Sequence, residues 1–165
     1  FGVVGWKNSG KTTLTERLVS ELAGRGHLVS TVKHAHHDFD IDLPGTDSFR
    51  HRAAGATEVA IVSSGRWALM HELRGEDEPA LEEVLARLSP CDIVLVEGYK
   101  RGGHAKIEAR RVQAFDRTPL AAGDPGIVAV AADHELADEA LPVFSLDDIE
   151  AIADFIETAT GLKKP

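Results

Sequence analysis

The sequence contains a single cysteine, Cys91, and no long hydrophobic run. One cysteine cannot form an internal disulfide, and this low usage fits a reducing compartment. A membrane-spanning helix needs roughly 20 consecutive apolar residues, and no run approaches that length. No secretory signal peptide is recognisable either. We therefore expect a cytoplasmic protein without a membrane segment. We also expect that its start has been trimmed, because the chain opens at Phe1 without a methionine.

Basic residues are also scarce: 18 lysines and arginines stand against 27 acidic residues, and the formal net charge is −9. Non-specific nucleic-acid binding needs a basic face. The overall charge therefore argues against a nucleic-acid partner, although it leaves room for a local basic patch. Hydrophobic residues make up 43% of the chain, as in ordinary globular proteins. The length of 165 residues suits one domain, which we assign to residues 1–165.

The most informative feature is a glycine-rich octapeptide that follows the apolar segment Phe1–Val4. Its sequence is Gly5-Trp6-Lys7-Asn8-Ser9-Gly10-Lys11-Thr12, which matches the pattern G-x-x-x-x-G-K-T. Apolar residues at helical spacing predict a helix over 11–23 directly after it. Strand, loop and helix in this order predict a phosphate-binding loop, because backbone N–H groups and a helix N-terminus then point at one anion.

Each residue type in this loop has an expected task. Lys11 would bring its charge to the β- and γ-phosphates, and the Thr12 hydroxyl would ligate Mg²⁺. Lys7 stands one position too late to match the extra loop lysine of some dimeric P-loop ATPases, so we expect it to face solvent and strengthen the positive field. The predicted nucleotide contacts in the loop and just after it are Gly5, Asn8, Ser9, Gly10, Lys11, Thr12 and Thr13.

The rest of the chain alternates between strand-like and helix-like segments. Strands are expected at 28–33, 57–63, 66–72, 93–96, 106–112, 127–131 and 142–144, and helices at 47–54, 79–88 and 145–156. Ser145 and Asp148 resemble a capping box at the start of the last helix. This alternation predicts an α/β fold with a doubly wound, mostly parallel sheet of P-loop NTPase type. The turn at Ser64-Gly65 predicts an antiparallel hairpin.

Two carboxylates are candidate partners of the phosphate-binding loop. In parallel sheets, ligands sit beyond the carboxyl ends of the strands. Glu97 closes a buried strand and is expected to hold or orient Mg²⁺, with a surface glutamate at a strand end as the alternative. Asp47, at the start of a predicted helix, completes the expected metal set of Thr12, Asp47 and Glu97. Lys11 and Glu97 are the candidate catalytic residues.

Other polar residues leave alternatives open. Asp133 follows the strand 127–131, where either a carboxylate that binds the nucleotide base or a helix cap is expected. The loop residues His34, His36, His37, Asp38, Asp40 and Asp42 are suitable either for a transition metal or for a polar switch-like loop. The basic residues Lys100, Arg101, His104 and Lys106 form either a site for a phosphorylated ligand or a solvated loop.

Taken in order, these landmarks resemble the molybdopterin-guanine dinucleotide biosynthesis adaptor family, the MobB-type P-loop proteins. The resemblance covers most of residues 1–112 and, more loosely, 127–156. Only the phosphate-binding loop is specific by itself; the order and spacing of the others make the resemblance informative. The matching segments are Gly5–Leu14, Val32-Lys33-His34, Asp42–Ser48 with Arg50 and Arg52, Ala54-Gly55-Ala56, Val96–Lys100 and Lys106-Ile107-Glu108.

The resemblance implies a GTP-binding accessory protein that forms a homodimer. Such a protein assists the molybdopterin guanylyltransferase, which transfers GMP from GTP to molybdopterin, and it hydrolyses GTP only slowly. GTP and Mg²⁺ are the implied cofactors, with molybdopterin as a further candidate ligand. The sequence lacks the N-K-x-D motif of many GTPases, so the guanine preference rests on the resemblance alone. The hairpin 57–72 is the candidate dimer-forming segment, with an edge inside one chain as the alternative.

Two other functions use the same phosphate-binding loop. A free-standing small-molecule kinase or ATP-dependent ligase would depend on positioning and electrostatics more than on a special base, so the absence of a nucleophile with an adjacent base does not exclude it. A metallochaperone GTPase would use the loop His34–Asp42 to bind its metal.

Overall fold

The computed structural model describes residues 1–35 and 39–163. Two compact units are present: one combines Phe1–His34 with Val84–Pro165, and the other is Ala35–Glu83. The assignment of residues 1–165 to one domain stays a prediction. Among the described residues, no helix has the length and apolar character needed to span a membrane.

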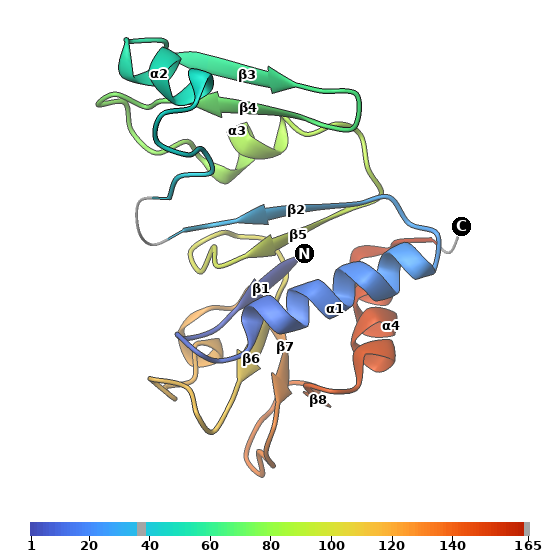
Figure 1. Ribbon diagram of the computed structural model, residues 1–165. Helices are drawn as coiled ribbons and strands as arrows, with labels where there is room; N and C mark the ends of the chain where they lie inside the picture. Colours follow the sequence, from blue (N-terminus) through green and yellow to red (C-terminus); the bar gives the residue numbers. More distant parts are fainter. Residues whose placement is uncertain (36–38, 164–165) are drawn as a thin grey trace. The chain divides into compact units, whose positions relative to one another are not determined.

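The first unit is built on a six-stranded sheet in which every pairing is parallel (Figure 1). The strand order is β2-β5-β1-β6-β7-β8. All three residues of the central strand β1 are buried, as expected for a strand with neighbours on both sides and cover on both faces. The strands are β1 (Gly2–Val4), β2 (Val29–Lys33), β5 (Ile93–Glu97), β6 (Lys106–Arg110), β7 (Ile127–Ala132) and β8 (Val143–Ser145).

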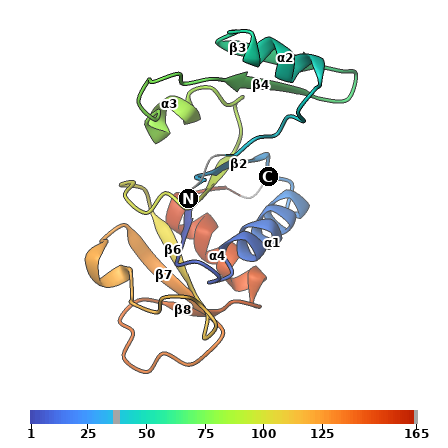
Figure 2. The same ribbon diagram turned by 60° about the vertical axis from the view of Figure 1, so that its left-hand side comes forward.

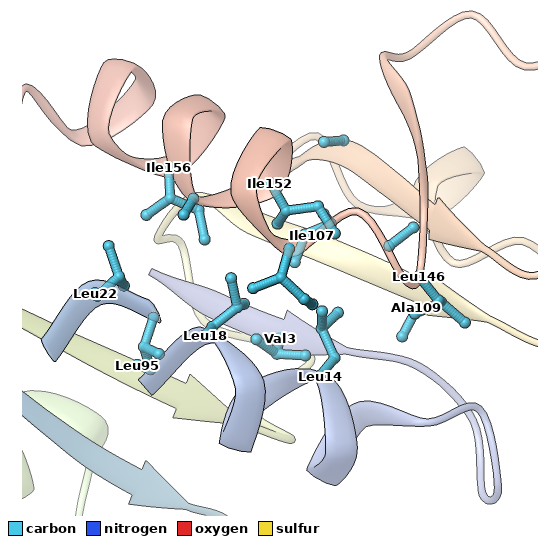
Figure 3. Packing of buried hydrophobic residues seen from close by; sticks show 14 of the residues in the cluster. Val3, Leu14, Leu18, Leu22, Leu95, Ile107, Ala109, Leu146, Ile152 and Ile156 are labelled. Atoms are coloured by element: carbon cyan, nitrogen blue, oxygen red, sulfur yellow. The ribbon is translucent and has the colours of Figure 1, made fainter. Parts of the chain in front are cut away.

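Two helices, α1 (Lys11–Gly24) and α4 (Ile149–Thr160), pack side by side against this sheet (Figures 1 and 2). Each has apolar residues at i, i+3 or i+4 spacing, which places them on one face of the helix. These side chains form a continuous core with the apolar residues of the strands (Figure 3). Its fully buried members include Val3, Leu14, Leu18, Leu22, Leu95, Ile107, Ile152 and Ile156.

Strand β6 sends apolar side chains into that core and charged side chains to the other face of the sheet. Ile107 and Ala109 belong to the core, while Lys106 and Glu108 are 0% and 1% exposed. Successive residues of a strand point to opposite faces, which explains the alternation. The Lys106 ammonium lies 2.8 Å from a carboxylate oxygen of Asp124 and also donates to the carbonyl of Gly102. For Lys106, a buried residue of β6, the solvated-loop alternative is therefore wrong.

Glu108 is balanced in the same way on that face. Its carboxylate accepts hydrogen bonds from the backbone N–H groups of Leu120 and Ala121, at 2.9 and 3.1 Å, and from the Arg110 guanidinium at 2.7 Å. Ala121 opens a short 3-10 helix, η1 (Ala121–Gly123). Buried charges are tolerated when they are paired and hydrogen-bonded, so Glu108 fixes this segment against the sheet.

The second unit contains the helix α2 (Asp47–Ala53) and the antiparallel hairpin of β3 (Glu58–Val62) and β4 (Trp67–His71). The hairpin forms a sheet of its own, separate from the parallel one. Arg52 is the main ionic centre of this unit. Its guanidinium contacts the carboxylates of Asp40 and Glu72 at 2.8 Å and that of Asp42 at 3.5 Å.

The structure confirms the predicted α/β fold, with its parallel sheet and its hairpin, and it corrects two helix boundaries. Helix α3 (Leu81–Leu85) is shorter than the predicted 79–88. Helix α4 begins at Ile149, with Asp148 as its N-cap, whose carboxylate accepts a hydrogen bond from the Ala151 N–H. Ser145 does not cap this helix because it is the last residue of β8 and pairs there with β7.

We expect Leu18→Ala to lower the free energy of unfolding by about 2–5 kcal/mol, because it leaves a cavity in a close-packed core. Leu18 is 0% exposed. The matched control is Leu28→Ala, at a side chain that is 65% exposed, where we expect a change within about 0.5 kcal/mol. Urea denaturation of both variants measures the difference, and equal losses would contradict the packing described here.

Candidate nucleotide-binding site

The loop between β1 and α1 has a backbone that only small residues can follow at two positions. Gly5 and Gly10 have φ angles of 150° and 90°. A Cβ atom at Gly5 would lie 2.3 Å from the Ser9 hydroxyl oxygen and 2.6 Å from the Ala109 carbonyl oxygen. At Gly10 it would lie 2.8 Å from Nε of Arg111. The two glycines therefore allow the tight curve that turns backbone N–H groups toward an anion.

Lys11 lies at the first position of α1 and folds back over this loop. Its ammonium donates a hydrogen bond of 2.7 Å to the Trp6 carbonyl. Burial lowers the pKa of Lys11; the Glu97 carboxylate acts in the opposite direction, while the ammonium groups of Lys100 and Lys33 lower the pKa further. The Lys33 ammonium lies 3.6 Å from the Glu97 carboxylate and the Lys100 ammonium 3.9 Å from the centre of the Trp6 ring, so several cations gather around one loop. Such an arrangement attracts phosphate.

Thr12 and Glu97, two of the three residues expected to bind Mg²⁺, meet beside the loop. Glu97 ends β5 and lies opposite Val3 of β1 in the parallel register. The Thr12 hydroxyl donates a hydrogen bond of 2.8 Å to its carboxylate, and the Lys33 ammonium lies 3.6 Å from the same oxygen. Hydroxyl and carboxylate oxygens are ligands that Mg²⁺ accepts alongside water and phosphate. The donor set therefore fits Mg²⁺.

Trp6 fixes the middle of the loop to a neighbouring segment. Its indole N–H donates to the Thr118 carbonyl at 2.7 Å, and the Lys100 ammonium lies 3.9 Å from the centre of its ring. The Lys7 carbonyl accepts a hydrogen bond from the Phe115 N–H at 3.1 Å. Lys7 itself is exposed, as predicted. These contacts give Trp6 a structural task that the G-x-x-x-x-G-K-T pattern does not specify.

Asp133 follows β7 and links the ends of two strands. One of its carboxylate oxygens accepts hydrogen bonds from the Val112 N–H at 2.9 Å and from the His134 ring at 2.8 Å. Burial raises the pKa of Asp133, but the hydrogen bonds from His134 and Val112, together with the charge of His134, act in the opposite direction, and the pKa is lowered overall. No helix follows in residues 134–148, all of which are described, so the helix-cap alternative is wrong. Contact with a nucleotide base stays a prediction.

A model of the family "Molybdopterin guanine dinucleotide synthesis protein B" (MobB) matches residues 1–133 of this chain. The chain belongs to the MobB family. It is 41% identical over 154 residues to the molybdopterin-guanine dinucleotide biosynthesis adapter protein of Escherichia coli (strain K12), covering 92% of this chain and 87% of that protein. The adapter protein of Haemophilus influenzae is 37% identical, with 95% and 86% covered.

Solved MobB structures share this fold. The MobB homolog from Bacillus stearothermophilus matches with a TM-score of 0.70 and 30% identity over 98% of this chain and 97% of that one. Bacillus subtilis MobB matches with a TM-score of 0.73 and 27% identity, covering 99% and 98%. These matches confirm the resemblance inferred from the motifs. None of the relatives named here is described as a kinase, a ligase or a metallochaperone.

Asp47 and the histidine-rich loop are the other predicted parts of the site in this MobB-family chain. Asp47 is the first residue of α2 in the second unit, where its side chain is 91% exposed and lies 3.8 Å from Arg50. Its role as a metal ligand stays a prediction. Of the histidine-rich loop, His36, His37 and Asp38 lie outside the described residues. His34 packs against the Tyr99 ring, with centroids 4.8 Å apart.

The remaining acids of that loop, Asp40 and Asp42, contact an arginine. The guanidinium of Arg52 donates hydrogen bonds to Asp40, and these hydrogen bonds lower the pKa of Asp40. Asp42 accepts hydrogen bonds from the hydroxyl groups of Thr46 and Ser48. Within residues 1–35 and 39–163, no cluster of three or more histidine, cysteine or acidic side chains is arranged to hold a metal ion. The described part of the loop thus gives the metallochaperone alternative no support.

Replacing Gly10 by alanine is expected to cost about 1–3 kcal/mol of unfolding free energy, because the side chain would force a residue with a positive φ against the Arg111 guanidinium. The matched control is Gly24→Ala at the end of α1, where a Cβ would meet nothing within 4 Å. There we expect a gain of about 0.4–1 kcal/mol. Thermal or urea unfolding measures both changes, and an unperturbed Gly10→Ala protein would contradict the loop geometry.

Proposed function

We propose that this protein is a GTP-binding adapter in the biosynthesis of molybdopterin guanine dinucleotide. The observation that carries the proposal is the hydrogen bond from Thr12 to Glu97 beside the glycine loop, because it joins the expected phosphate and Mg²⁺ ligands at one edge of the sheet. Membership of the MobB family supports the biosynthetic role. The name of the product, a guanine dinucleotide, is the reason to prefer GTP over ATP.

In this proposal the loop and the start of α1 hold the phosphates. Backbone N–H groups of residues 5–13 and the Lys11 ammonium would bind the phosphate oxygens. Thr12 and Glu97, with Asp47 as the third candidate, would hold Mg²⁺, which neutralises phosphate charge when it is bound. Asp133 would contact the base through the oxygen that the Val112 and His134 hydrogen bonds leave unused.

The geometry favours binding over rapid hydrolysis. Glu97 already accepts the Thr12 hydrogen bond and lies 3.6 Å from the Lys33 ammonium. A carboxylate oxygen that already accepts a hydrogen bond and contacts an ammonium is placed to orient ligands, and none of its contacts described above positions it as a base for attack on a phosphate. We therefore propose that Lys11 and Glu97 support at most a slow GTPase activity. This slow hydrolysis would convert the GTP-bound adapter into a distinct GDP-bound state.

The partner in this proposal is the cytoplasmic molybdopterin guanylyltransferase, which adds GMP to molybdopterin. An adapter needs a surface that changes with the nucleotide, and the loop next to the phosphates offers one. Lys7 is exposed, and Trp6 connects the same loop to the Thr118 segment. Molybdopterin itself is a further candidate ligand of this chain, whereas nucleic acid and membrane are not among the proposed partners.

We also propose that the hairpin of β3 and β4 forms a homodimer contact. Val62 lies opposite Trp67 and Ala60 opposite Leu69, and opposite residues of an antiparallel pair share one face. Val62, Trp67 and Leu69 are 75%, 67% and 46% exposed, while Met70 on the other face is 8% exposed. An exposed apolar face on a two-stranded sheet fits a second copy of itself, because a two-fold contact brings identical patches together.

Copurification with the guanylyltransferase tests the adapter proposal. We expect the native protein to retain the enzyme in a manner that depends on GTP. Lys11→Ala should lower GTP affinity by about 2 kcal/mol or more in calorimetry, since it removes a charge-assisted contact, and should weaken the GTP dependence of retention. Lys7→Ala, an equal change in charge at an exposed site of the same loop, should lower GTP affinity less than Lys11→Ala does.

The two measurements separate two kinds of failure. No retention of the enzyme with GTP, GDP or no nucleotide would contradict the adapter role. Unchanged GTP affinity of Lys11→Ala would contradict the phosphate role of Lys11.

Trp67→Glu tests the dimer. Placing a carboxylate in an apolar contact is costly, because the charge loses its hydration. We expect light scattering after size exclusion to show a dimer for the native protein and a monomer for the variant. As a control, Leu28→Glu places a carboxylate at an exposed apolar residue of the first unit and should leave the dimer intact. A Trp67→Glu protein that stays dimeric would argue against the hairpin contact.

A further inference from the structure

We propose that Arg111 is a second cation of the nucleotide site, binding from the β6 side the phosphates that GDP and GTP share. This inference rests on the proposed nucleotide-binding function and adds a residue to it. The sequence pattern alone did not single out Arg111, since it lies 100 positions after Lys11 and outside the G-x-x-x-x-G-K-T motif.

The position of Arg111 follows from the strand order. β6 pairs with β1 in parallel, so the carboxyl ends of the two strands lie at the same edge of the sheet. Arg111 comes directly after β6, and the glycine loop comes directly after β1. The two segments touch: Nε and Cζ of Arg111 lie 2.8 and 3.1 Å from where a Cβ of Gly10 would be. The guanidinium thus rests on the backbone next to Lys11.

Arg110 has carboxylate partners among the described residues, whereas its neighbour Arg111 has none. Arg110 forms ion pairs of 2.7 Å with Glu108 and 2.6 Å with Glu139. The Arg111 side chain is half-buried, and it forms no hydrogen bond or ion pair with any residue of 1–35 or 39–163. A partly desolvated guanidinium without an anion is unfavourable. A phosphate bound in the loop would supply the missing partner through the planar fork of donors.

A second donor lies in the same place. The hydroxyl of Ser9 is buried, in a residue that is 1% exposed, and it has no hydrogen-bond partner among the described residues. Ser9, Trp6 and Arg111 line one cavity of about 80 Å³. Pockets that enclose a drug-sized ligand measure roughly 300–1,000 Å³. This cavity is too small for a nucleoside. Glu108 and Asp116 also line it, but their carboxylates already accept hydrogen bonds from the protein. The Ser9 hydroxyl and the Arg111 guanidinium therefore remain as donors that suit a phosphate oxygen at the loop.

The side of the loop on which Arg111 lies indicates which phosphates it would contact. Glu97 ends β5, and Arg111 follows β6, while β1 lies between these two strands. The Thr12 and Glu97 pair marks the side of Mg²⁺ and the terminal phosphate. Arg111 therefore faces the phosphates closer to the nucleoside, which GDP also carries. Its contribution should be the same for the two nucleotides.

The test is calorimetric titration of the native protein, Arg111→Ala and Arg111→Lys with GTP and GDP in the presence of Mg²⁺. Because Arg111→Ala loses a charge-assisted contact, its affinity should fall about tenfold or more, and equally for GTP and GDP. Arg111→Lys keeps the charge but loses the paired guanidinium donors, so its affinity should lie between those of the native protein and Arg111→Ala. Arg87→Ala, at an exposed arginine before β5, has the same change in charge and should bind like the native protein.

Several results would overturn the inference. If Arg111→Ala and Arg111→Lys bind both nucleotides as tightly as the native protein does, Arg111 makes no phosphate contact, although the proposed nucleotide site stands. A loss confined to GTP would place Arg111 at the terminal phosphate, against the inference. If the native protein binds neither nucleotide, the proposed function fails and the inference fails with it. Should Arg111→Ala not fold, Arg111→Lys decides between the same outcomes.

Discussion

The pairing of a three-residue strand with a neighbour on each side is the constraint on which the site depends. β1 (Gly2–Val4) is completely buried between β5 and β6. Because all three strands run parallel, their carboxyl ends lie at one edge of the sheet. The glycine loop leaves from the middle position, Glu97 closes β5, and Arg111 follows β6. A change in the register of either pairing would move one of these charged groups along the sheet and separate it from the loop.

The charged groups of this unit divide into two kinds. Lys106, Glu108 and Arg110 are buried or nearly so, and each has an opposite charge within 2.8 Å. These pairs fix loops to the sheet, and their charges cancel locally. Lys11 and Arg111 lie at the glycine loop, and no carboxylate of residues 1–35 or 39–163 forms an ion pair with either of them. An acidic chain with a net charge of −9 thus keeps a local positive field, the requirement for attracting a triphosphate.

The sequence was sufficient for features that depend on local patterns. The strand, glycine loop and helix at the start required only short-range spacing, and so did the buried run that ends at Glu97. The burial of Lys106 was missed because a lysine in a strand looks exposed until its partner Asp124, 18 positions later in the chain, is known to lie beside it. The proposed role of Arg111 depends on strand order, which alternating strands and helices leave open. Similarly, Ser145 has a cap-like sequence, but its pairing with β7 prevents it from capping α4.

Every function proposed for this protein requires that the glycine loop bind a phosphate chain. The most direct measurement is a crystal structure of the protein with a non-hydrolysable GTP analogue and Mg²⁺. We predict that the phosphates lie against the backbone N–H groups of residues 5–13, with the Lys11 ammonium on their oxygens and the metal ion beside Thr12 and Glu97. An analogue bound at another place, with the Lys11 ammonium still on the Trp6 carbonyl, would contradict the central claim.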